Sequence, residues 1–322
     1  MTVEPAPLFT DLDGVPSGGT AQWVRGADGV RLRVAHWCPD GARGTVFLLP
    51  GRTEYIEKYG VTVDALADHG FATLVIDWRG QGLSDRLIED SRIGHVDRFS
   101  DYHVDLAALR HVALTLDLPR PWHMLAHSMG GGIALGALMD GFEVQSAAFT
   151  GPMWGIGMSP VMRPLGWALA CAGPVVGLGE MLPPSTTYDT YVTRQEFKGN
   201  SLTTDPQMYK MLQEQVNAHP ELGLGGPSLI WLRESLYACR EMAQRPSPHI
   251  PSLTLLGARE KIVDVQRVHD RMAAWPNGTL EVLPHCEHEV LMERPTLRTD
   301  AVSRVVAHFN SSWDVGQSAK EA

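Results

Sequence analysis

The segment around Ser128 constrains the fold of this chain more than any other part of the sequence. An apolar run, 122–126, ends abruptly in Ala126-His127-Ser128-Met129-Gly130, and a stretch rich in glycine and alanine follows. This order predicts a strand, a sharp turn with Ser128 at its tip, and a helix that packs closely against a sheet. Such a turn strains the backbone, so the residues two positions before and after the serine must be small, as Ala126 and Gly130 are. The alternative is a glycine-rich turn without chemistry.

Predicted strands and helices alternate along most of the chain. We expect an antiparallel pair at 21–24 and 32–37, joined by a turn at 26–29. Buried strands are expected at 45–49, 71–76, 122–126, 147–150, 251–256 and 279–283. Helices are expected at 61–69, 99–116, 265–275 and 296–309. This alternation is typical of an α/β fold with a doubly wound, mostly parallel sheet.

The alternation lapses between 152 and 246, where helical patterns occur at 205–218 and 228–243. We interpret this stretch as a helical cap inserted into the sheet domain. The expected organisation is a first core part at 1–151, the cap at 152–246, a second core part at 247–310 and a flexible tail at 311–322. Within the cap, 164–178 carries no charge. Its short length and its Gly and Pro content favour a buried or interface-seeking element over a membrane-spanning helix.

Charge and cysteine content exclude some classes of partner. The net charge is −10, so there is no excess of Lys and Arg to neutralise phosphates, and nucleic acid is not expected as a partner. The four cysteines lie far apart and form no CxxC pair, which argues against a zinc knuckle and favours reduced thiols in a cytoplasmic location. Residues 1–10 lack a basic region and an apolar run, so no secretory signal is expected.

Ser128 needs partners, because a serine hydroxyl is a weak nucleophile until a base takes its proton and a third group holds that base. Both partners are expected on loops at the carboxyl ends of later strands. One loop offers Glu260, favoured as the acid, and Asp264, which is either the alternative acid or the N-cap of the next helix. The following loop offers His285 and His288. His288 is favoured as the base, because the loop needs length to return over the serine.

Two backbone N–H groups are expected to form an oxyanion hole for the developing negative charge. One belongs to Met129, directly after the serine, and the other to Arg52 in the loop Pro50-Gly51-Arg52. The alternative for that loop is an ordinary Pro-Gly turn. The segment Asp77-Trp78-Arg79-Gly80-Gln81-Gly82-Leu83-Ser84-Asp85 is expected to support the site, with Arg79 and the two aspartates tying loops together.

The segment His285-Cys286-Glu287-His288 contains two histidines close in the sequence, as some metal sites do. No matching set of distant ligands accompanies them, so neither a metal nor a cofactor is expected.

Taken together, these segments resemble the α/β-hydrolase superfamily, and within it the bacterial lysophospholipase and monoacylglycerol lipase branch, often grouped with serine aminopeptidase-like hydrolases. The resemblance implies Ser128 as nucleophile, His288 as base, Arg52 and Met129 as oxyanion donors, and the helical insertion as a lid. Two residues depart from the family pattern. Pro50 stands where many relatives have His, and Glu260 stands where the acid is usually Asp. The resemblance rests on the segments 50–59, 77–84, 94–97, 126–131 and 288–293.

The resemblance implies a serine hydrolase that cleaves carboxylic esters through an acyl-enzyme on Ser128. The implied ester substrate is a lysophospholipid or a monoacylglycerol. Such a chain would have a small-molecule or lipid-like ester as its partner and could touch a membrane surface through the cap. The alternatives are a small-molecule esterase, lactonase or aminopeptidase on the same triad, and a non-catalytic small-molecule-binding protein. Apolar cap residues would hold an acyl chain or form the core of the cap: Met153, Trp154, Met158, Met162, Trp167 and Met181.

Overall fold

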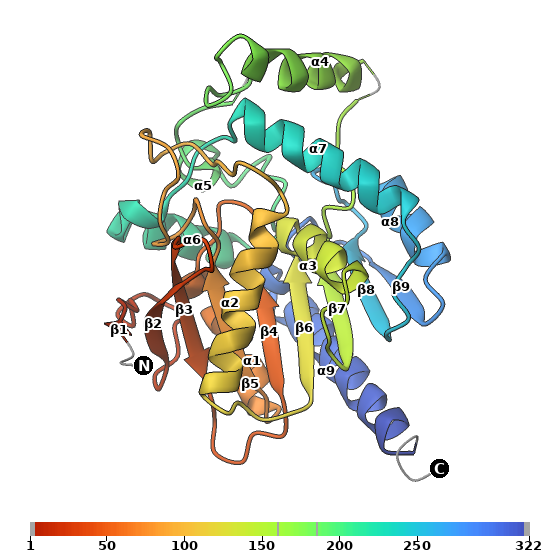
Figure 1. Ribbon diagram of the computed structural model, residues 1–322. Coiled ribbons are helices and arrows are strands. Elements are labelled where there is room, and N and C mark those ends of the chain that lie inside the picture. The colour runs from red at the N-terminus through yellow and green to blue at the C-terminus, as the bar shows by residue number, and fades with distance from the viewer. Residues whose placement is uncertain (1–3, 160, 185, 319–322) are drawn as a thin grey trace.

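A single mixed sheet organises the chain (Figure 1). The computed structural model describes residues 4–159, 161–184 and 186–318, with side chains up to 312. In these residues the strand order is β1-β2-β3-β5-β4-β6-β7-β8-β9, antiparallel from β1 to β5 and parallel from β5 to β9. The predicted mostly parallel α/β sheet is confirmed. The strands are β1 (Glu4–Pro5), β2 (Thr20–Arg25), β3 (Arg31–Trp37), β4 (Thr45–Leu49), β5 (Ala72–Asp77), β6 (Trp122–His127), β7 (Ser146–Thr150), β8 (Ser252–Gly257) and β9 (Gly278–Leu283).

The sheet separates two hydrophobic cores, because alternate residues of each strand point to opposite faces. In β4, Phe47 and Leu49 belong to one core, whereas Val46 and Leu48 belong to the other. Both faces are covered, which explains why the parallel strands read as continuous apolar runs. Helices α2 (Asp101–Thr115), α3 (Met129–Met139) and α8 (Val265–Ala273) cover the first face, and α1 (Gly60–Asp68) and α9 (Pro295–Ser318) cover the second.

The segment between β7 and β8 lies above the carboxyl edge of the parallel strands (Figure 1). It holds α4 (Met162–Val175), α5 (Tyr191–Arg194), α6 (Pro206–Ala218) and α7 (Leu229–Gln244), and its described residues contribute no strand to the sheet. Short 3₁₀ turns occur here and in the core, at η1 (Ile56–Tyr59), η2 (Pro220–Leu222) and η3 (Val290–Met292). Among the helices of the described residues, none has the length and apolar character needed to cross a membrane.

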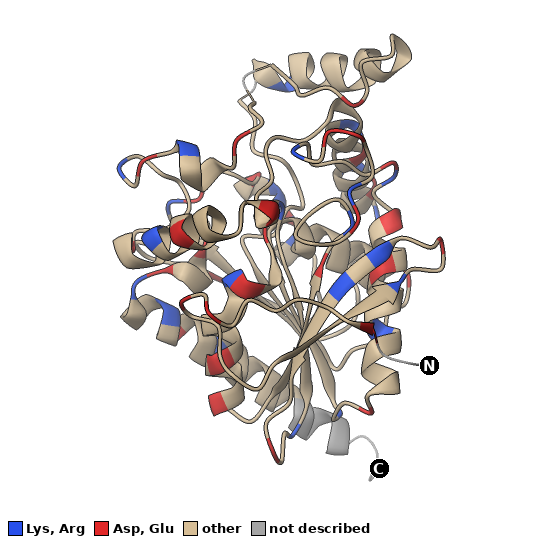
Figure 2. Cartoon of the chain, turned by 90° about the vertical axis from the view of Figure 1, so that its left-hand side faces the viewer, with Lys and Arg blue, Asp and Glu red and all other residues tan. Residues whose placement is uncertain are grey.

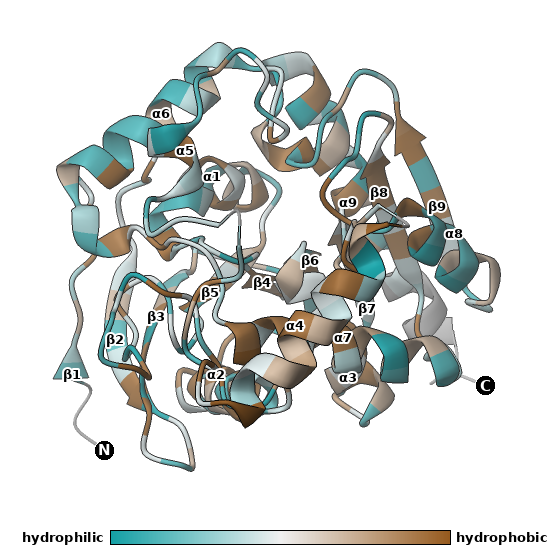
Figure 3. Ribbon diagram, turned by 90° about the horizontal axis from the view of Figure 1, so that it is seen from above, coloured by the Kyte–Doolittle hydropathy of each residue, from teal (hydrophilic) through white to brown (hydrophobic). Residues whose placement is uncertain are grey.

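The two halves of this insertion rest on different faces of the sheet. Met208 and Leu212 of α6 join the core around α1, whereas Trp231 and Met242 of α7 join the core around α2 and α3. Helix α4 packs on α7 and contains a single charged residue, Arg163 (Figure 2). Seen from above, α5 and α6 lie on one side of β4 and β6, and α4 and α7 lie on the other (Figure 3). The insertion therefore spans the edge of the sheet where the site residues were predicted.

The C-terminal segment differs from the expected flexible tail at 311–322. Helix α9 continues past residue 310 to Ser318, and residues 319–322 lie outside the described part. Ser312 is anchored to β7, because its hydroxyl donates to Ser146 Oγ at 3.0 Å and its carbonyl accepts from Gln145 Nε2 at 2.8 Å. These contacts hold the helix against the sheet where its sequence becomes polar.

Candidate active site

Ser128 lies at the tip of the predicted sharp turn, which the structure confirms between β6 and α3. Its φ and ψ are 49° and −116°, a region that a residue with a side chain rarely adopts and that costs about 1–3 kcal/mol. Close approach of the chain explains the small neighbour, because a Cβ on Gly130 would lie 2.2 Å from the carbonyl oxygen of Leu49. The turn is held from the next strand, since the Ser128 N–H donates to the Thr150 carbonyl at 3.0 Å.

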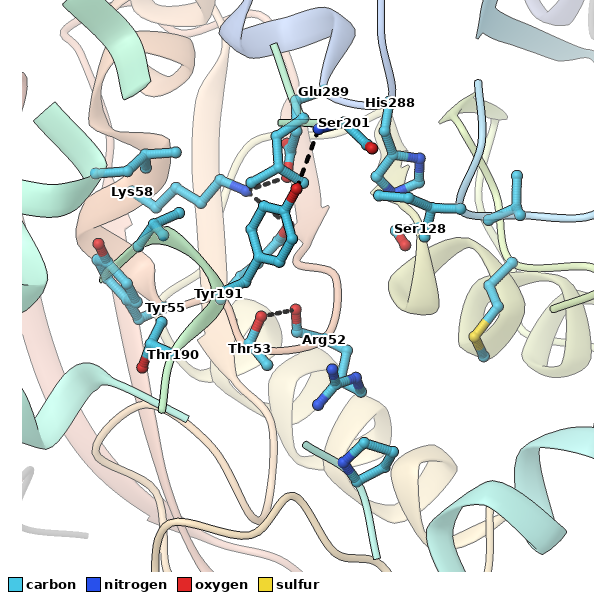
Figure 4. A pocket seen from close by; sticks show the side chains of 18 of the residues that line it. Arg52, Thr53, Tyr55, Lys58, Ser128, Thr190, Tyr191, Ser201, His288 and Glu289 are labelled. Carbon is cyan, nitrogen blue, oxygen red and sulfur yellow. Dashed lines mark hydrogen bonds and ion pairs between the residues drawn. The ribbon is translucent and has the colours of Figure 1, made fainter. Parts of the chain in front are cut away.

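His288 and Glu260 come together beside this serine. His288 Nδ1 donates to Glu260 Oε2 at 2.6 Å, and the two side chains are 4% and 1% exposed. Nδ1 is engaged, so Nε2 is the ring nitrogen left to serve Ser128, and Figure 4 shows the His288 ring next to the serine at the cavity wall. The other candidate base, His285, is exposed. This arrangement matches the one in which a carboxylate orients an imidazole that activates a hydroxyl.

Glu260 is held as a carboxylate by its surroundings. Burial raises its pKa, but the hydrogen bond and charge of His288 and the backbone N–H groups of Ile262 and Val263 outweigh burial, so the pKa lies below its ordinary value. Those N–H groups donate to Oε1 at 2.6 and 3.2 Å. Asp264 is the N-cap of α8, the alternative role expected for it. It accepts from Arg267 N at 3.3 Å and pairs with Arg163 at 2.8 Å.

Gly151 is a site residue that sequence reasoning missed. It follows β7 with φ at 48°, and a Cβ there would lie 2.9 Å from His288 Nδ1 and 3.1 Å from Glu260 Oε2. Only glycine leaves room for the acid–base pair at this point. The signal in the sequence was a glycine directly after a predicted strand, but nothing in it indicated the approach of residues more than a hundred positions away.

The N–H groups of Arg52 and Met129 are available for an oxyanion. Within the described residues, neither donates to a backbone or side-chain acceptor of the protein. Met129 is the first residue of α3, where N–H groups lack partners inside the helix and the helix dipole is positive. Arg52 follows β4, whose carboxyl end lies beside that of β6. The arrangement can stabilise a negative oxygen next to Ser128.

The segment 77–85 supports this loop, as expected. Trp78 Nε1 donates to the Pro50 carbonyl at 2.8 Å, and Gln81 Nε2 donates to the Gly51 carbonyl at 2.8 Å. Arg79 and the two aspartates tie this segment to other parts of the chain, as expected. Each of the three charges pairs outside the segment, because the turn at Gly80 and Gly82 directs them to different strands and helices: Arg79 with Asp28 and Asp105, Asp77 with Arg33, and Asp85 with Arg31.

A buried charged cluster lies behind Ser128, formed by Glu54, Lys58, His127 and Glu289. Lys58 Nζ lies 2.6 Å from Glu54 Oε1 and 2.6 Å from Glu289 Oε1, and all four side chains are at most 6% exposed. The three groups other than Lys58 could in principle hold a cation. The ammonium of Lys58 already serves both carboxylates, so the donor set is better explained as a salt-bridge network than as a metal site.

His127 completes the charge balance of this cluster. Its Nδ1 donates to the Thr150 carbonyl at 2.9 Å, and its Nε2 lies 3.2 Å from Glu289 Oε2 and 3.5 Å from Glu54 Oε1. Both nitrogens face acceptors, a situation that the doubly protonated ring satisfies. Burial lowers the pKa of His127, but the two carboxylates outweigh burial and raise it. When His127 is protonated, it and Lys58 balance the charges of the two carboxylates.

This charge balance predicts a pH dependence of stability. The folded-state pKa of His127 is raised above the unfolded value of 6.5, so its contribution is fully present below about pH 6.5 and is lost as pH rises through the folded value. We expect the difference in Tm between the wild type and His127→Gln to shrink with rising pH. His123 supplies the control of opposite sign: burial lowers its pKa to about 3, so protonation of the unfolded chain lowers stability as pH falls below 6.5. A His127→Gln difference that is constant from pH 5 to 9 would contradict the assignment.

The site opens into a cavity of about 410 Å³, within the range of small-molecule sites. Ser128 and His288 lie at its wall, together with Arg52, Tyr55 and Lys58 (Figure 4). Apolar side chains from both halves of the insertion and from the loop after β8 also line it: Met153, Ile156, Val192, Leu202, Leu212, Val216, Trp231, Leu232, Ile262 and Val263.

Of the apolar cap residues singled out in the sequence, Met153 lines this cavity. Trp154 does not, because it packs in the core with its ring 5.2 Å from that of Phe149. Met162 and Met181 are exposed on the outside of the insertion. Sequence composition located an apolar insertion but not the side chains that face the serine, since these depend on how α6 and α7 sit on the two cores.

Comparison with known proteins agrees with this geometry. Residues 40–295 match the family model described as serine aminopeptidase, S33. The chain is 34% identical over 308 residues to lysophospholipase L2 of Escherichia coli (strain K12), covering 88% of this chain and 86% of that protein. It is 27% identical over 296 residues to the monoacylglycerol lipase of Mycolicibacterium smegmatis, covering 88% of this chain and 96% of that protein.

Solved structures show the same fold at lower sequence identity. A soluble variant of the monoglyceride lipase from Saccharomyces cerevisiae superposes with a TM-score of 0.70 at 19% identity, covering 91% of this chain and 94% of the other. A thermostable carboxyl esterase from Bacillus coagulans gives a TM-score of 0.73 at 16% identity, covering 92% and 99%. At these identities the likeness concerns the fold alone.

Proposed function

Because the chain belongs to the serine aminopeptidase S33 family of α/β-hydrolases, we propose that it is a serine hydrolase that cleaves lysophospholipid or monoacylglycerol. The observation that carries the proposal is Ser128 on a strained turn beside the His288–Glu260 pair, in a cavity lined largely by apolar side chains. Curated relatives named lysophospholipase and monoacylglycerol lipase support the choice of substrates.

In the mechanism that follows, Ser128 Oγ attacks the ester carbonyl carbon while His288 Nε2 takes the hydroxyl proton. Glu260 holds the ring and stabilises its charge, and the N–H groups of Arg52 and Met129 donate to the carbonyl oxygen as it becomes negative. Collapse of the tetrahedral intermediate breaks the ester bond, and His288 passes its proton to the leaving alcohol. Water then attacks the acyl-enzyme with the same assistance, and release of the fatty acid restores Ser128.

The test is hydrolysis of p-nitrophenyl esters of increasing acyl length, of monoacylglycerol and of lysophospholipid, with Ser128→Ala as the blank. Serine-dependent turnover that rises with chain length supports the proposal. Turnover confined to short esters, lactones or aminoacyl amides would replace the lipid with a small molecule on the same triad. Binding of these compounds without turnover would favour a non-catalytic binding protein of the same fold.

Gly151 provides a test of the triad that does not remove any reacting group. We expect Gly151→Ala to lower kcat by about 10- to 100-fold, because the new Cβ would displace His288 and Glu260. Gly141→Ala is the matched control, since Gly141 also has positive φ, at 90°, but has no atom within 4 Å of the position a Cβ would take. Both variants are expected to lose about 1–2 kcal/mol of stability from backbone strain. Equal kcat values in the two variants would contradict the prediction.

Residues 152–246 act in this proposal as a lid whose outer helix contacts a lipid surface. Around α4 the insertion exposes an apolar surface with no acidic residue between Arg163 and Glu180. Contact with a lipid surface would remove that apolar area from water and bring the cavity close to the substrate. The exposed apolar side chains of this surface are Val161, Met162, Leu165, Val175, Val176, Leu178 and Met181.

Co-sedimentation with zwitterionic lipid vesicles tests the contact. Leu165→Asp combined with Val175→Asp is expected to abolish binding to the vesicles. Val282→Asp is the control, because Val282 is 45% exposed on β9, away from the insertion. Equal sedimentation of wild type and the α4 double variant would show that this surface does not carry the contact.

A cytoplasmic location also remains part of the proposal. Its support is that Cys38, Cys171, Cys239 and Cys286 are all free thiols, as expected in a reducing compartment. Fractionation of cells, followed by quantification of the chain in each fraction, tests it.

A further inference from the structure

The cavity beside Ser128 contains two basic side chains in very different surroundings. Lys58 donates to Glu54 and Glu289, each at 2.6 Å, so its charge is neutralised within the protein. Arg52 has no such partner, because no carboxylate of the described side chains lies within ion-pair distance of it. The cavity therefore presents one uncompensated positive charge.

The surroundings of the Arg52 guanidinium leave most of its donors unused. Nη1 donates to the Gly225 carbonyl at 2.9 Å, and the group lies 5.5 Å from the ring centre of Trp231. Within the described residues, Gly225 is its one hydrogen-bond acceptor, although a guanidinium carries five N–H groups. Burial lowers the pKa of Arg52 to about 10, so the side chain is still charged at neutral pH.

Arg86 provides a comparison with Arg52, because the hydrogen bonds of Arg86 are typical of a structural role. Its guanidinium donates to four carbonyls, those of Gly80, Gly82, Glu221 and Gly223, and so joins the segment after β5 to the insertion. Arg52 makes one such bond and instead lines the cavity. A tie to Gly225 alone does not account for a charge kept at the wall of a largely apolar cavity, where an unpaired ion is costly.

From this we infer that the Arg52 side chain binds the phosphodiester of a lysophospholipid head group and makes the site select lysophospholipid over monoacylglycerol. The inference rests on the proposed function, since it places the ester of the same lipid at Ser128. A guanidinium and a phosphate form two parallel charge-assisted hydrogen bonds, the pairing that the unused donors offer. Monoacylglycerol has the same ester and glycerol but no anion for this position.

The position of Arg52 suits this role, because a single residue serves both ends of the substrate. In the proposed mechanism its backbone N–H donates to the ester carbonyl oxygen. Its side chain lines the cavity and extends away from His288 (Figure 4). In a lysophospholipid the phosphate is separated from the ester by the glycerol carbons, and the methylene chain of an arginine bridges a comparable length. Anchoring of the head group would then align the ester with the oxyanion donors.

The kinetic test compares lysophospholipid with monoacylglycerol of the same acyl chain. In Arg52→Gln we expect the ratio of the two kcat/KM values to fall by about 10- to 100-fold in favour of monoacylglycerol, as for the loss of a charged hydrogen bond. The ratio is the readout because any shift of the Arg52 backbone lowers both values by the same factor. Arg52→Lys, which keeps the charge without the planar fork, is expected to restore part of the ratio.

Arg92→Gln is the matched control for the loss of one positive charge near the insertion. Arg92 is exposed, pairs with Asp90 at 2.7 Å and does not line the cavity. Its substitution should leave the ratio unchanged. If Arg52→Gln lowers both activities equally, the inference is wrong while the proposed function stands. If the wild type hydrolyses neither lipid in a Ser128-dependent manner, the proposed function fails instead.

A binding experiment tests Arg52 independently of turnover. In the Ser128→Ala background, calorimetry with an ether-linked lysophospholipid at monomeric concentrations should give a Kd that rises about 10- to 100-fold on adding Arg52→Gln. The Kd of the matching alkylglycerol should not change. Inorganic phosphate distinguishes a head-group site from a general anion site: weak binding agrees with the inference, and binding as tight as that of the ether lipid would overturn it.

Discussion

Replacement of Ser128 by alanine is expected to lower kcat for ester hydrolysis by about 10⁵- to 10⁶-fold, to a residual rate set by substrate binding and the oxyanion donors. The loss is that large because the acyl-enzyme cannot form, so the reaction loses its nucleophile rather than one of several contributions. His288→Ala should cost about as much, and combining the two should add little, because the two residues act as one unit. Single-turnover measurement with a chromogenic ester checks both statements.

Backbone strain at the same position allows a second readout. Ser128→Ala keeps a side chain at φ 49°, so its stability should equal that of the wild type within about 0.5 kcal/mol. Ser128→Gly removes the steric cost and is expected to raise the free energy of unfolding by about 1 kcal/mol, while being equally inactive. Urea unfolding of the wild type, Ser128→Ala and Ser128→Gly measures these differences in the free energy of unfolding. Retention of esterase activity in either variant would show that Ser128 is not the nucleophile.

Glu260→Gln is expected to lower kcat by about 10⁴-fold with little change in KM, because an amide can no longer fix the His288 tautomer or stabilise its positive charge. The carboxylate lies 2.6 Å from His288 Nδ1, and its pKa is lowered, so it is charged throughout the neutral range. Steady-state measurement of kcat and KM for the wild type and Glu260→Gln checks this expectation.

Asp264→Asn is the matched control for Glu260→Gln. It makes the same chemical change four residues further along, at the N-cap of α8 and in the pair with Arg163. Asparagine is an equally good N-cap, and the Arg163 pair is partly exposed, so kcat should stay within about twofold of the wild type. A larger loss in Asp264→Asn than in Glu260→Gln would reverse the assignment of the acid.

The sheet and its helices could be predicted from the sequence because their signals are local. The buried runs at 122–126 and 251–256 became β6 and β8, and the periodic stretch at 99–116 became α2. The turn at Ser128 was equally local, since it depends on small residues within two positions of the serine. These features can be predicted without knowing how distant parts of the chain fold.

The choice between Glu260 and Asp264 could not be made in the same way. Both carboxylates follow β8, and only the three-dimensional course of the loop shows which of them meets His288. The charged cluster could not be predicted from the sequence either, because the hydrogen bond from Lys58 to Glu289 joins residues 231 positions apart. Glu54 and Lys58 lie four residues apart, but nothing in the sequence indicates that they are buried together with Glu289.

The attachment of the insertion to the catalytic loop has a consequence for protein engineering. Glu289 N donates to the Leu202 carbonyl at 2.8 Å, and His288 N approaches the Ser201 carbonyl at 3.4 Å. A chimaera that exchanged the whole insertion for that of a family member would thus remove acceptors from the loop that carries His288. Swaps intended to alter substrate range should keep residues 200–205 and exchange α4, which packs on α7.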